Sequence, residues 1–208
     1  MVYPIEKLTI IPLIKLWVKK VTGTENLPKE GAAILAANHS SYVDHLMIGA
    51  YVATKVNRRF HFLAKKEHFQ GLQKLWHIYV GAIPLDRKKG GKHALKVALN
   101  LLSQGKLIII YPEGTRTLTG KLQKAKTGVA RLALQSKVPV IPIGLKGTFE
   151  IMPKGKYIPK AKKAIMNIGK PIYFTNYYNK KINKKMLRDV TTKIMKEIAR
   201  LSKQKYNF

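Results

Sequence analysis

The chain has 208 residues, 46% of them hydrophobic, which suits one domain with a sizeable core. It contains no cysteine, and this excludes a disulfide framework, a thiol nucleophile and a cysteine-based metal site. Its 40 lysines and arginines against 10 acidic residues give a formal net charge of +30. Such an excess implies an anionic partner: nucleic acid, an acidic membrane surface or phosphorylated small molecules. No apolar run approaches the ~20 residues of a spanning helix, and we expect no transmembrane segment or signal peptide.

Residues 4–20 are apolar with interspersed lysines, and Pro12 is expected to kink or divide any helix there. The apolar face can enter a membrane interface while the lysines stay near headgroups, or it can pack on the core of the domain. We assign residues 1–20 to an amphipathic, membrane-contacting segment and residues 21–208 to the main domain. A turn-rich connection over 21–31 leads into that domain.

Alternating apolar runs and helical patterns follow along the main domain. The expected strands are 32–37, 60–64, 82–85, 107–111, 138–145, 164–168 and 172–174. The expected helices are 44–54, 70–79, 93–104, 127–136 and 184–201. Strands alternating with helices predict an α/β domain with a central, largely parallel mixed sheet and helices on both faces. Pro139 and Pro142 suggest that their strand is an edge strand or an irregular site.

His39 and Asp44 lie between the first strand and the following helix of the main domain. On one helix, residues five apart are separated by about 140° around the axis, so these two side chains meet only if the helix begins between them. Ser41 as N-cap, with Asp44 three residues later, would make a capping-box-like start and turn the carboxylate back toward the imidazole. Asp44 would then orient His39 as a general base for a substrate hydroxyl. The alternative is that Asp44 is only a cap and His39 only a loop residue.

Three polar clusters follow expected strands: His39 with Asp44, Asp86 with Arg87, and Glu113 to Arg116. Ligands of open α/β sheets bind outside the carboxyl ends of the strands, so we expect these clusters to share one site. Arginine forks match phosphate oxygens, which makes Arg87 and Arg116 candidate phosphate ligands. Each arginine can instead form a surface ion pair.

Four blocks stand in order: N-H-S-S-Y-V-D (38–44), G-A-I-P-L-D-R (81–87), Y-P-E-G-T-R-T (111–117) and V-P-V-I-P-I (138–143). Together they resemble the glycerolipid acyltransferase family, the 1-acylglycerol-3-phosphate acyltransferases and their glycerol-3-phosphate relatives. The similarity includes further short segments at 24–28, 64–67 and 168–172 and covers nearly the whole chain.

The resemblance implies that His39 activates the acceptor hydroxyl for direct attack on an acyl thioester and that Asp44 orients it. It implies that Glu113 binds the glycerol moiety, whereas a core salt bridge is its structural alternative. Gly114 and Thr115 fall in the same substrate-binding block, and Gly114 either admits a close ligand or only permits the turn. Lys65 is a candidate for stabilising the thioester oxyanion, or a solvated lysine. Pro139 and Pro142 match the block associated with the acyl donor, or are structural.

The function that follows is transfer of a fatty acyl group from acyl-CoA or acyl carrier protein to lysophosphatidic acid, at the cytoplasmic face of a membrane with an anionic surface. Glycerol-3-phosphate or another lysophospholipid stays open as the acceptor. We expect no cofactor and no metal site. The alternative from another class is a basic nucleic-acid-binding protein, which is disfavoured because no recognition motif or segregated basic arm is present. No role is assigned to the other histidines, His45 included.

Overall fold

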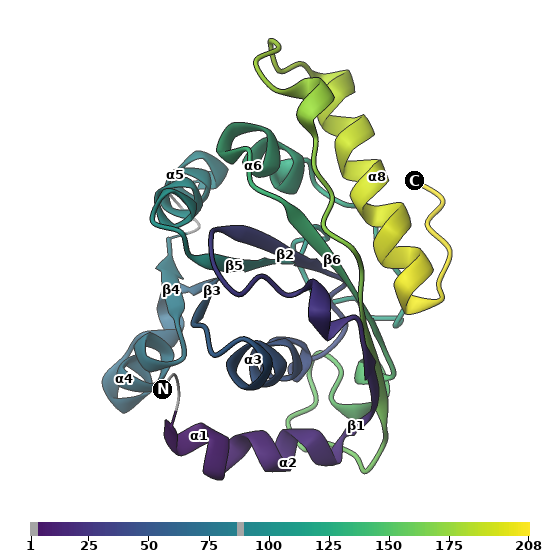
Figure 1. Cartoon of the computed structure of the whole chain (residues 1–208). Helices are drawn as coiled ribbons and strands as arrows, with labels where there is room; N and C mark the ends of the chain where they lie inside the picture. The colour runs from purple at the N-terminus through teal and green to yellow at the C-terminus, as the bar shows by residue number, and fades with distance from the viewer. Residues whose placement is uncertain (1–3, 87–89) are drawn as a thin grey trace.

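The computed structural model describes residues 4–86 and 90–208, which contain one seven-stranded sheet with helices on both faces (Figure 1). The strands are β1 (Val18–Thr22), β2 (Ala33–Ala37), β3 (Phe60–Lys65), β4 (Ala82–Leu85), β5 (Leu107–Ile110), β6 (Val140–Lys146) and β7 (Ala164–Ile168). Their order across the sheet is β1-β7-β6-β2-β5-β3-β4, and only the β6–β7 pair is antiparallel. The predicted α/β fold with a largely parallel mixed sheet is confirmed.

The central strand β2 shows why this sequence builds two helical layers. All five of its residues are buried, as expected for a parallel strand covered on both faces. Successive side chains of a strand point to opposite faces, so Ala33, Leu35 and Ala37 pack in one apolar cluster and Ile34 and Ala36 in the other. The first cluster includes α2 (Ile10–Leu16) and α3 (Asp44–Lys55). The second includes α5 (Gly90–Ser103), α6 (Gly128–Ser136) and α8 (Lys184–Ser202).

Shorter elements complete the described chain. They are α1 (Pro4–Leu8), α4 (Gly71–Tyr79) and α7 (Thr148–Ile151), with the 3-10 turns η1 (Thr24–Asn26), η2 (Lys66–His68) and η4 (Thr175–Tyr177). Over residues 4–86 and 90–208, no helix combines the length and the apolarity needed to cross a membrane.

The N-terminal segment is a divided helix followed by a strand. The helix breaks at Thr9, and Pro12 lies in the first turn of α2, where its missing N–H costs no helical bond. A proline ring clashes with the carbonyl four residues earlier, here that of Leu8, the last residue of α1. The predicted division is therefore confirmed. The strand β1 was not predicted, and it exists because Val18–Thr22 pairs in parallel with β7 at the edge of the sheet.

The two proline positions near β6 correct one expectation. The strand β6 is not an edge strand, because it pairs with β2 on one side and β7 on the other. The alternative, an irregular site, is the correct one: Pro142 accepts the N–H of Gly169 at 2.8 Å, just beyond the end of β7. Pro142 has no N–H to donate, and it stands where the hydrogen-bond ladder between β6 and β7 is interrupted. Beyond that break, residues 172–174 form only an isolated bridge between Ile172 and Val140 instead of the predicted strand.

Candidate active site

Two of the three predicted polar clusters meet at the carboxyl edge of the sheet. His39 follows β2 and Glu113 follows β5, and these strands are parallel neighbours. The backbone N–H of His39 donates to Glu113 Oε1 at 2.7 Å, across 74 residues of sequence. The backbone N–H of Thr117 donates to the carbonyl of His39 at 2.9 Å. Both main-chain polar groups of His39 are therefore held by the turn that contains Glu113.

The His39 and Asp44 side chains form the predicted pair. His39 Nδ1 lies 2.9 Å from Asp44 Oδ2, and the same oxygen accepts the backbone N–H groups of Ser40 and Ser41, each at 2.8 Å. The Asp44 side chain is fully buried, whereas 12% of the His39 side chain is exposed. A carboxylate only accepts hydrogen bonds, so it selects the tautomer with the proton on Nδ1 and leaves Nε2 of a neutral imidazole as a proton acceptor.

The helix start at this turn differs from the prediction in one respect. The carboxylate of Asp44 accepts the Ser41 N–H, which is the returning half of a capping box. The other half is absent: the Ser41 hydroxyl donates to the carbonyl of Met152 at 2.7 Å and accepts the N–H of Val43 at 3.2 Å. The helix α3 begins at Asp44 with Val43 as N-cap. Ser41 thus ties the turn to a distant segment instead of capping the helix.

Glu113 is a buried carboxylate whose oxygens both have partners within the chain. Oε1 accepts the His39 N–H, and Oε2 accepts the backbone N–H of Gln123 at 2.8 Å. Only 4% of the residue is exposed. Burial raises the pKa of the Glu113 carboxyl, and the hydrogen bonds from His39 and Gln123 oppose that rise. Its partners in the described chain are N–H groups, not a lysine or arginine, so the core salt-bridge alternative is wrong, and the contact with a glycerol moiety stays a prediction.

Tyr111, the first residue of the third block, was given no role of its own from the sequence, and it packs directly on the candidate base. Its ring stacks on the His39 imidazole with centroids 3.8 Å apart and an interplanar angle of 14°. Its hydroxyl is buried and has no hydrogen-bond partner in the part of the chain that the structure describes. Burial and the nearby negative charge of Asp44 raise the pKa of Tyr111 well above its usual range. The phenol therefore stays neutral and fixes one face of the imidazole.

Arg116 lies beside the same turn. Its Nε donates to the carbonyl of Ser41 at 3.2 Å, and its Cζ lies 3.9 Å from the centre of the Tyr42 ring. These contacts orient the guanidinium and leave its terminal nitrogens for another ligand. The surface ion-pair alternative has no support, because Arg116 contacts no carboxylate in the described chain.

Gly114 and Thr115 form the exposed tip of this turn. Gly114 has a φ of +77°, which an L side chain rarely adopts, and the turn therefore requires a glycine. The Thr115 carbonyl accepts from the Gln123 side chain at 3.1 Å. Both residues stand between Glu113 and Arg116 in the turn that holds the His39 backbone, and their contact with substrate stays a prediction.

Comparison with known proteins assigns this arrangement to a family. A model of the acyltransferase family matches residues 19–146, more than half of the chain. The chain belongs to the acyltransferase family. It is 30% identical over 164 residues to the 1-acyl-sn-glycerol-3-phosphate acyltransferase of Bacillus subtilis (strain 168), a match that covers 76% of this chain and 75% of that protein. The corresponding enzyme of Streptococcus pneumoniae (strain ATCC BAA-255 / R6) is 29% identical over 184 residues, covering 87% of this chain and 65% of that one.

The fold of this acyltransferase is also that of a solved relative. The crystal structure of the 1-acyl-sn-glycerophosphate (LPA) acyltransferase PlsC from Thermotoga maritima superposes with a TM-score of 0.72 at 26% identity, covering 97% of this chain and 83% of that chain. Other relatives are longer: the match to chloroplastic LPAT1 of Arabidopsis thaliana, 32% identical over 152 residues, spans 40% of that protein. The resemblance read from the four blocks is confirmed.

Other predicted residues of this acyltransferase lie outside the hydrogen-bonded cluster or outside the described chain. Arg87 lies outside the described residues, and so does the side chain of Lys65, the last residue of β3. Pro139 stands before β6, and its carbonyl accepts the N–H of Ile34 at 3.0 Å. Pro142 is paired with Ala36 inside the sheet. Both prolines take part in the sheet, and their contact with an acyl donor stays a prediction.

Two further residues were given no role from the sequence: Asn38, which supports the turn, and His45, whose pKa the site perturbs. The buried amide of Asn38 donates to the carbonyl of Leu145 at 2.9 Å and accepts its N–H at 2.8 Å, so a side chain continues the pairing of β2 with β6 into the turn. Burial, together with the charges of His39 and Arg116, lowers the pKa of His45 to about 4. His45 is therefore neutral at physiological pH beside the candidate base.

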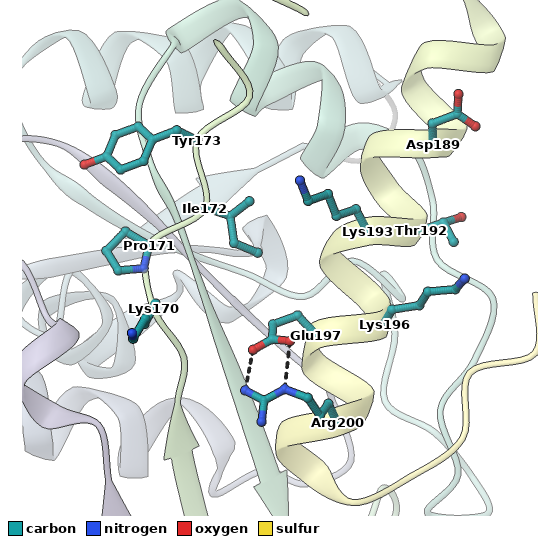
Figure 2. A pocket seen from close by; sticks show the side chains of 10 residues that line it. All are labelled: Lys170, Pro171, Ile172, Tyr173, Asp189, Thr192, Lys193, Lys196, Glu197 and Arg200. Carbon is teal, nitrogen blue, oxygen red and sulfur yellow. Dashed lines mark hydrogen bonds and ion pairs between the residues drawn. The ribbon is translucent and has the colours of Figure 1, made fainter. Parts of the chain in front are cut away.

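A separate hollow lies between α8 and residues 170–173, and it has a volume of about 900 Å³ (Figure 2). Its cations are all exposed, and one of them, Arg200, pairs with Glu197. The lining residues are Lys170, Pro171, Ile172, Tyr173, Asp189, Thr192, Lys193, Lys196, Glu197 and Arg200. No residue of the four acyltransferase blocks lines this groove, which we call the α8 groove.

Proposed function

We propose that this acyltransferase moves a fatty acyl group from an acyl thioester to the free hydroxyl of lysophosphatidic acid, giving phosphatidic acid. His39 is the general base and Asp44 orients it. The observation that carries the proposal is the 2.9 Å contact between His39 Nδ1 and the buried Asp44 carboxylate, at the strand end that also holds Glu113 and Arg116. The names of the related enzymes support the choice of acceptor.

The reaction follows from the tautomer that Asp44 selects. Nε2 of His39 takes the proton of the acceptor hydroxyl as its oxygen attacks the thioester carbonyl. The tetrahedral intermediate collapses with cleavage of the C–S bond, and the departing thiolate takes the proton from the imidazolium. The buried Asp44 charge stabilises the imidazolium between these two transfers. A positioned base of this kind contributes about 10²–10⁴ in rate. No acyl-enzyme is needed, which fits a chain without cysteine.

Binding of the acceptor needs a cation that the fold already orients. The Arg116 guanidinium is held through Nε and by stacking on Tyr42, so it can offer its remaining N–H groups to phosphate oxygens. Arg87 is proposed as a second phosphate ligand, and Lys65 as a donor to the oxyanion of the tetrahedral intermediate. Glu113 is proposed to act chiefly through the His39 backbone that it holds.

The proposed place of action is the surface of an anionic membrane, where the lipid acceptor resides. Three leucines of the N-terminal helices support this: Leu8, Leu13 and Leu16 are 83%, 57% and 64% exposed. Lys7 and Lys15 lie among them. An apolar helical face flanked by lysines fits a monotopic contact with a lipid interface.

The test is an acceptor screen that measures the free thiol released from an acyl thioester. Lysophosphatidic acid, glycerol-3-phosphate and a phosphate-free monoacylglycerol are offered in turn, with acyl-CoA and with acyl carrier protein thioesters. We expect thiol release that depends on lysophosphatidic acid, with phosphatidic acid as the product. Release that is the same with and without every acceptor would contradict the proposal. A preference for the phosphate-free acceptor would remove the role given to Arg116.

A further inference from the structure

Residues 153–163 form an exposed basic loop between α7 and β7. Lys154 to Lys163 are all exposed, and the segment contains five lysines and no acidic residue. At its tip, Tyr157 is 79% exposed and Ile158 is 84% exposed. Single exposed apolar residues are ordinary, but two large neighbours set among five lysines form an amphipathic surface.

The loop is fixed against the end of the N-terminal helix pair (Figure 1). The Lys160 N–H donates to the carbonyl of Ile151 at 2.8 Å and closes the loop. The Trp17 indole N–H donates to the carbonyl of Lys160 at 3.2 Å, and the Lys163 ammonium donates to the carbonyl of Leu16. The exposed tip is thereby joined to α2, whose Leu13 and Leu16 are also exposed.

The same loop contacts the candidate active site on its other side. The N–H of Tyr42 donates to the carbonyl of Met152, just before the loop, at 3.1 Å. The rings of Tyr42 and Tyr157 have centroids 5.7 Å apart, and Tyr42 carries the Arg116 guanidinium on its face. The loop therefore lies between α2 and the proposed phosphate ligand.

We propose that residues 153–163 are a membrane-docking loop that binds the surface of an anionic bilayer. Tyr157 and Ile158 enter the interface, where tyrosine rings are favoured, and the lysines contact anionic headgroups. Continuity with the exposed leucines of α2 favours a lipid surface over an acidic protein. The benefit to catalysis rests on the proposed function: a docked loop places Arg116 near the headgroup of a lipid acceptor.

Site-specific labelling tests the docking directly, because the chain has no cysteine of its own. The variant Ile158→Cys carries an environment-sensitive fluorophore, and Tyr173→Cys, an exposed position in the α8 groove, is the matched control. Vesicles of phosphatidylcholine mixed with phosphatidylglycerol should shift the Ile158→Cys probe to the blue and allow nitroxide lipids to quench it. The Tyr173→Cys probe should not respond. An unresponsive probe at position 158, while one at Leu13→Cys responds, would overturn the proposal.

Two charge variants test whether the position of the lysines, and not only the net charge of the protein, decides vesicle binding. Lys154, Lys156, Lys160 and Lys162 are replaced by glutamine, and the control replaces Lys180, Lys181, Lys184 and Lys185 at the opposite end of the molecule (Figure 1). We expect vesicle binding of the loop variant to fall by at least about tenfold and that of the control far less. Equal losses, or a probe at position 158 that responds to acyl carrier protein and not to vesicles, would overturn the proposal. Neither measurement uses a thioester, so failed acyl transfer with intact docking would contradict only the proposed function.

Discussion

The α8 groove and the His39 turn, a name that covers residues 38–44 and the residues 111–117 that hold them, are both rich in polar groups, but they differ in how these groups are held. The groove is a broad hollow of about 900 Å³ whose cations are exposed (Figure 2). At the His39 turn two carboxylates, Asp44 and Glu113, are buried and accept several N–H groups each. Burying a carboxylate is costly unless its oxygens accept hydrogen bonds, and in the described chain Asp44 Oδ1 has no hydrogen-bond partner. The fold bears this cost at the His39 turn, as folds do at functional sites. Volume and exposed charge alone do not identify the reactive part of this molecule.

The largest difference in kcat is expected between variants of Asp44 at the His39 turn and of Asp189 in the α8 groove. In Asp44→Asn the amide can donate to His39 Nδ1 and select the wrong tautomer, so we expect kcat to fall by about 10³-fold or more. In Asp189→Asn, an exposed groove carboxylate, kcat should change by less than about twofold. Steady-state kinetics with circular dichroism measures both. Equal activity of the two variants would abolish the distinction between the regions.

Substitution of Arg116 and substitution of Arg200 should differ in their effect on the KM for the acceptor. Arg116→Lys loses the Nε bond to Ser41 and the planar contact with Tyr42. We expect the KM for the phosphorylated acceptor to rise by about tenfold with kcat nearly unchanged, because an ammonium cannot form the guanidinium fork. Arg200→Lys in the groove is the control and should leave the KM as it is. An effect on KM from the groove variant alone would place phosphate binding there.

The tyrosines test the stacking on His39. Tyr111→Leu removes a stacked ring worth about 0.5–1.5 kcal/mol, so we expect kcat to fall by about 2- to 10-fold. Tyr111→Phe keeps the stack and removes a buried hydroxyl without a partner in the described chain, so it should retain activity with equal or higher stability. Tyr173→Leu in the groove is the matched control. Loss of activity in Tyr111→Phe would assign the role to the hydroxyl instead of the ring.

The last prediction concerns acid stability instead of activity, and it depends on His45, which follows Asp44 directly in the chain. The unfolded chain protonates His45 below about pH 6.5, whereas the folded protein does so only near a pKa of about 4. Stability is therefore lost as the pH falls through this window, on the order of 2 kcal/mol from this group. The variant His45→Gln should show a shallower fall between pH 6.5 and pH 4 in denaturant titrations. A slope equal to that of the unaltered protein would show that His45 is not held neutral.

Local pattern predicted most of the sheet but not the strand β1 at one of its edges. Buried strands such as Leu107–Ile110 are unbroken apolar runs and were readable directly. Val18–Thr22 lacks alternation, with a burial pattern of two exposed lysines between two half-buried valines, and a register shift interrupts its pairing. It becomes a strand only through β7, a partner more than 140 residues away. The prolines marked β6 as an edge strand or an irregular site, but the choice between them depends on β7, which ends opposite Pro142.

The contacts of the candidate site also fall into those that local sequence predicted and those that it did not. His39 and Asp44 are five residues apart, so the turn that joins them could be predicted from cap chemistry. The Glu113 contact to the His39 backbone spans 74 residues, and the two bonds of Asn38 to Leu145 span 107. Tyr111 looked like the last residue of an apolar strand, because stacking on an imidazole depends on which strands are neighbours. Such contacts follow from sheet order, which the sequence pattern did not specify.

The central claim is that His39 removes the proton from the acceptor hydroxyl. The most direct test measures acceptor-dependent thiol release by His39→Gln, a variant that keeps a polar side chain at the turn, together with its thermal unfolding. The account predicts a loss of at least about 10²-fold in turnover with a nearly unchanged melting temperature. A folded His39→Gln protein that turns over as fast as the unaltered enzyme would contradict it.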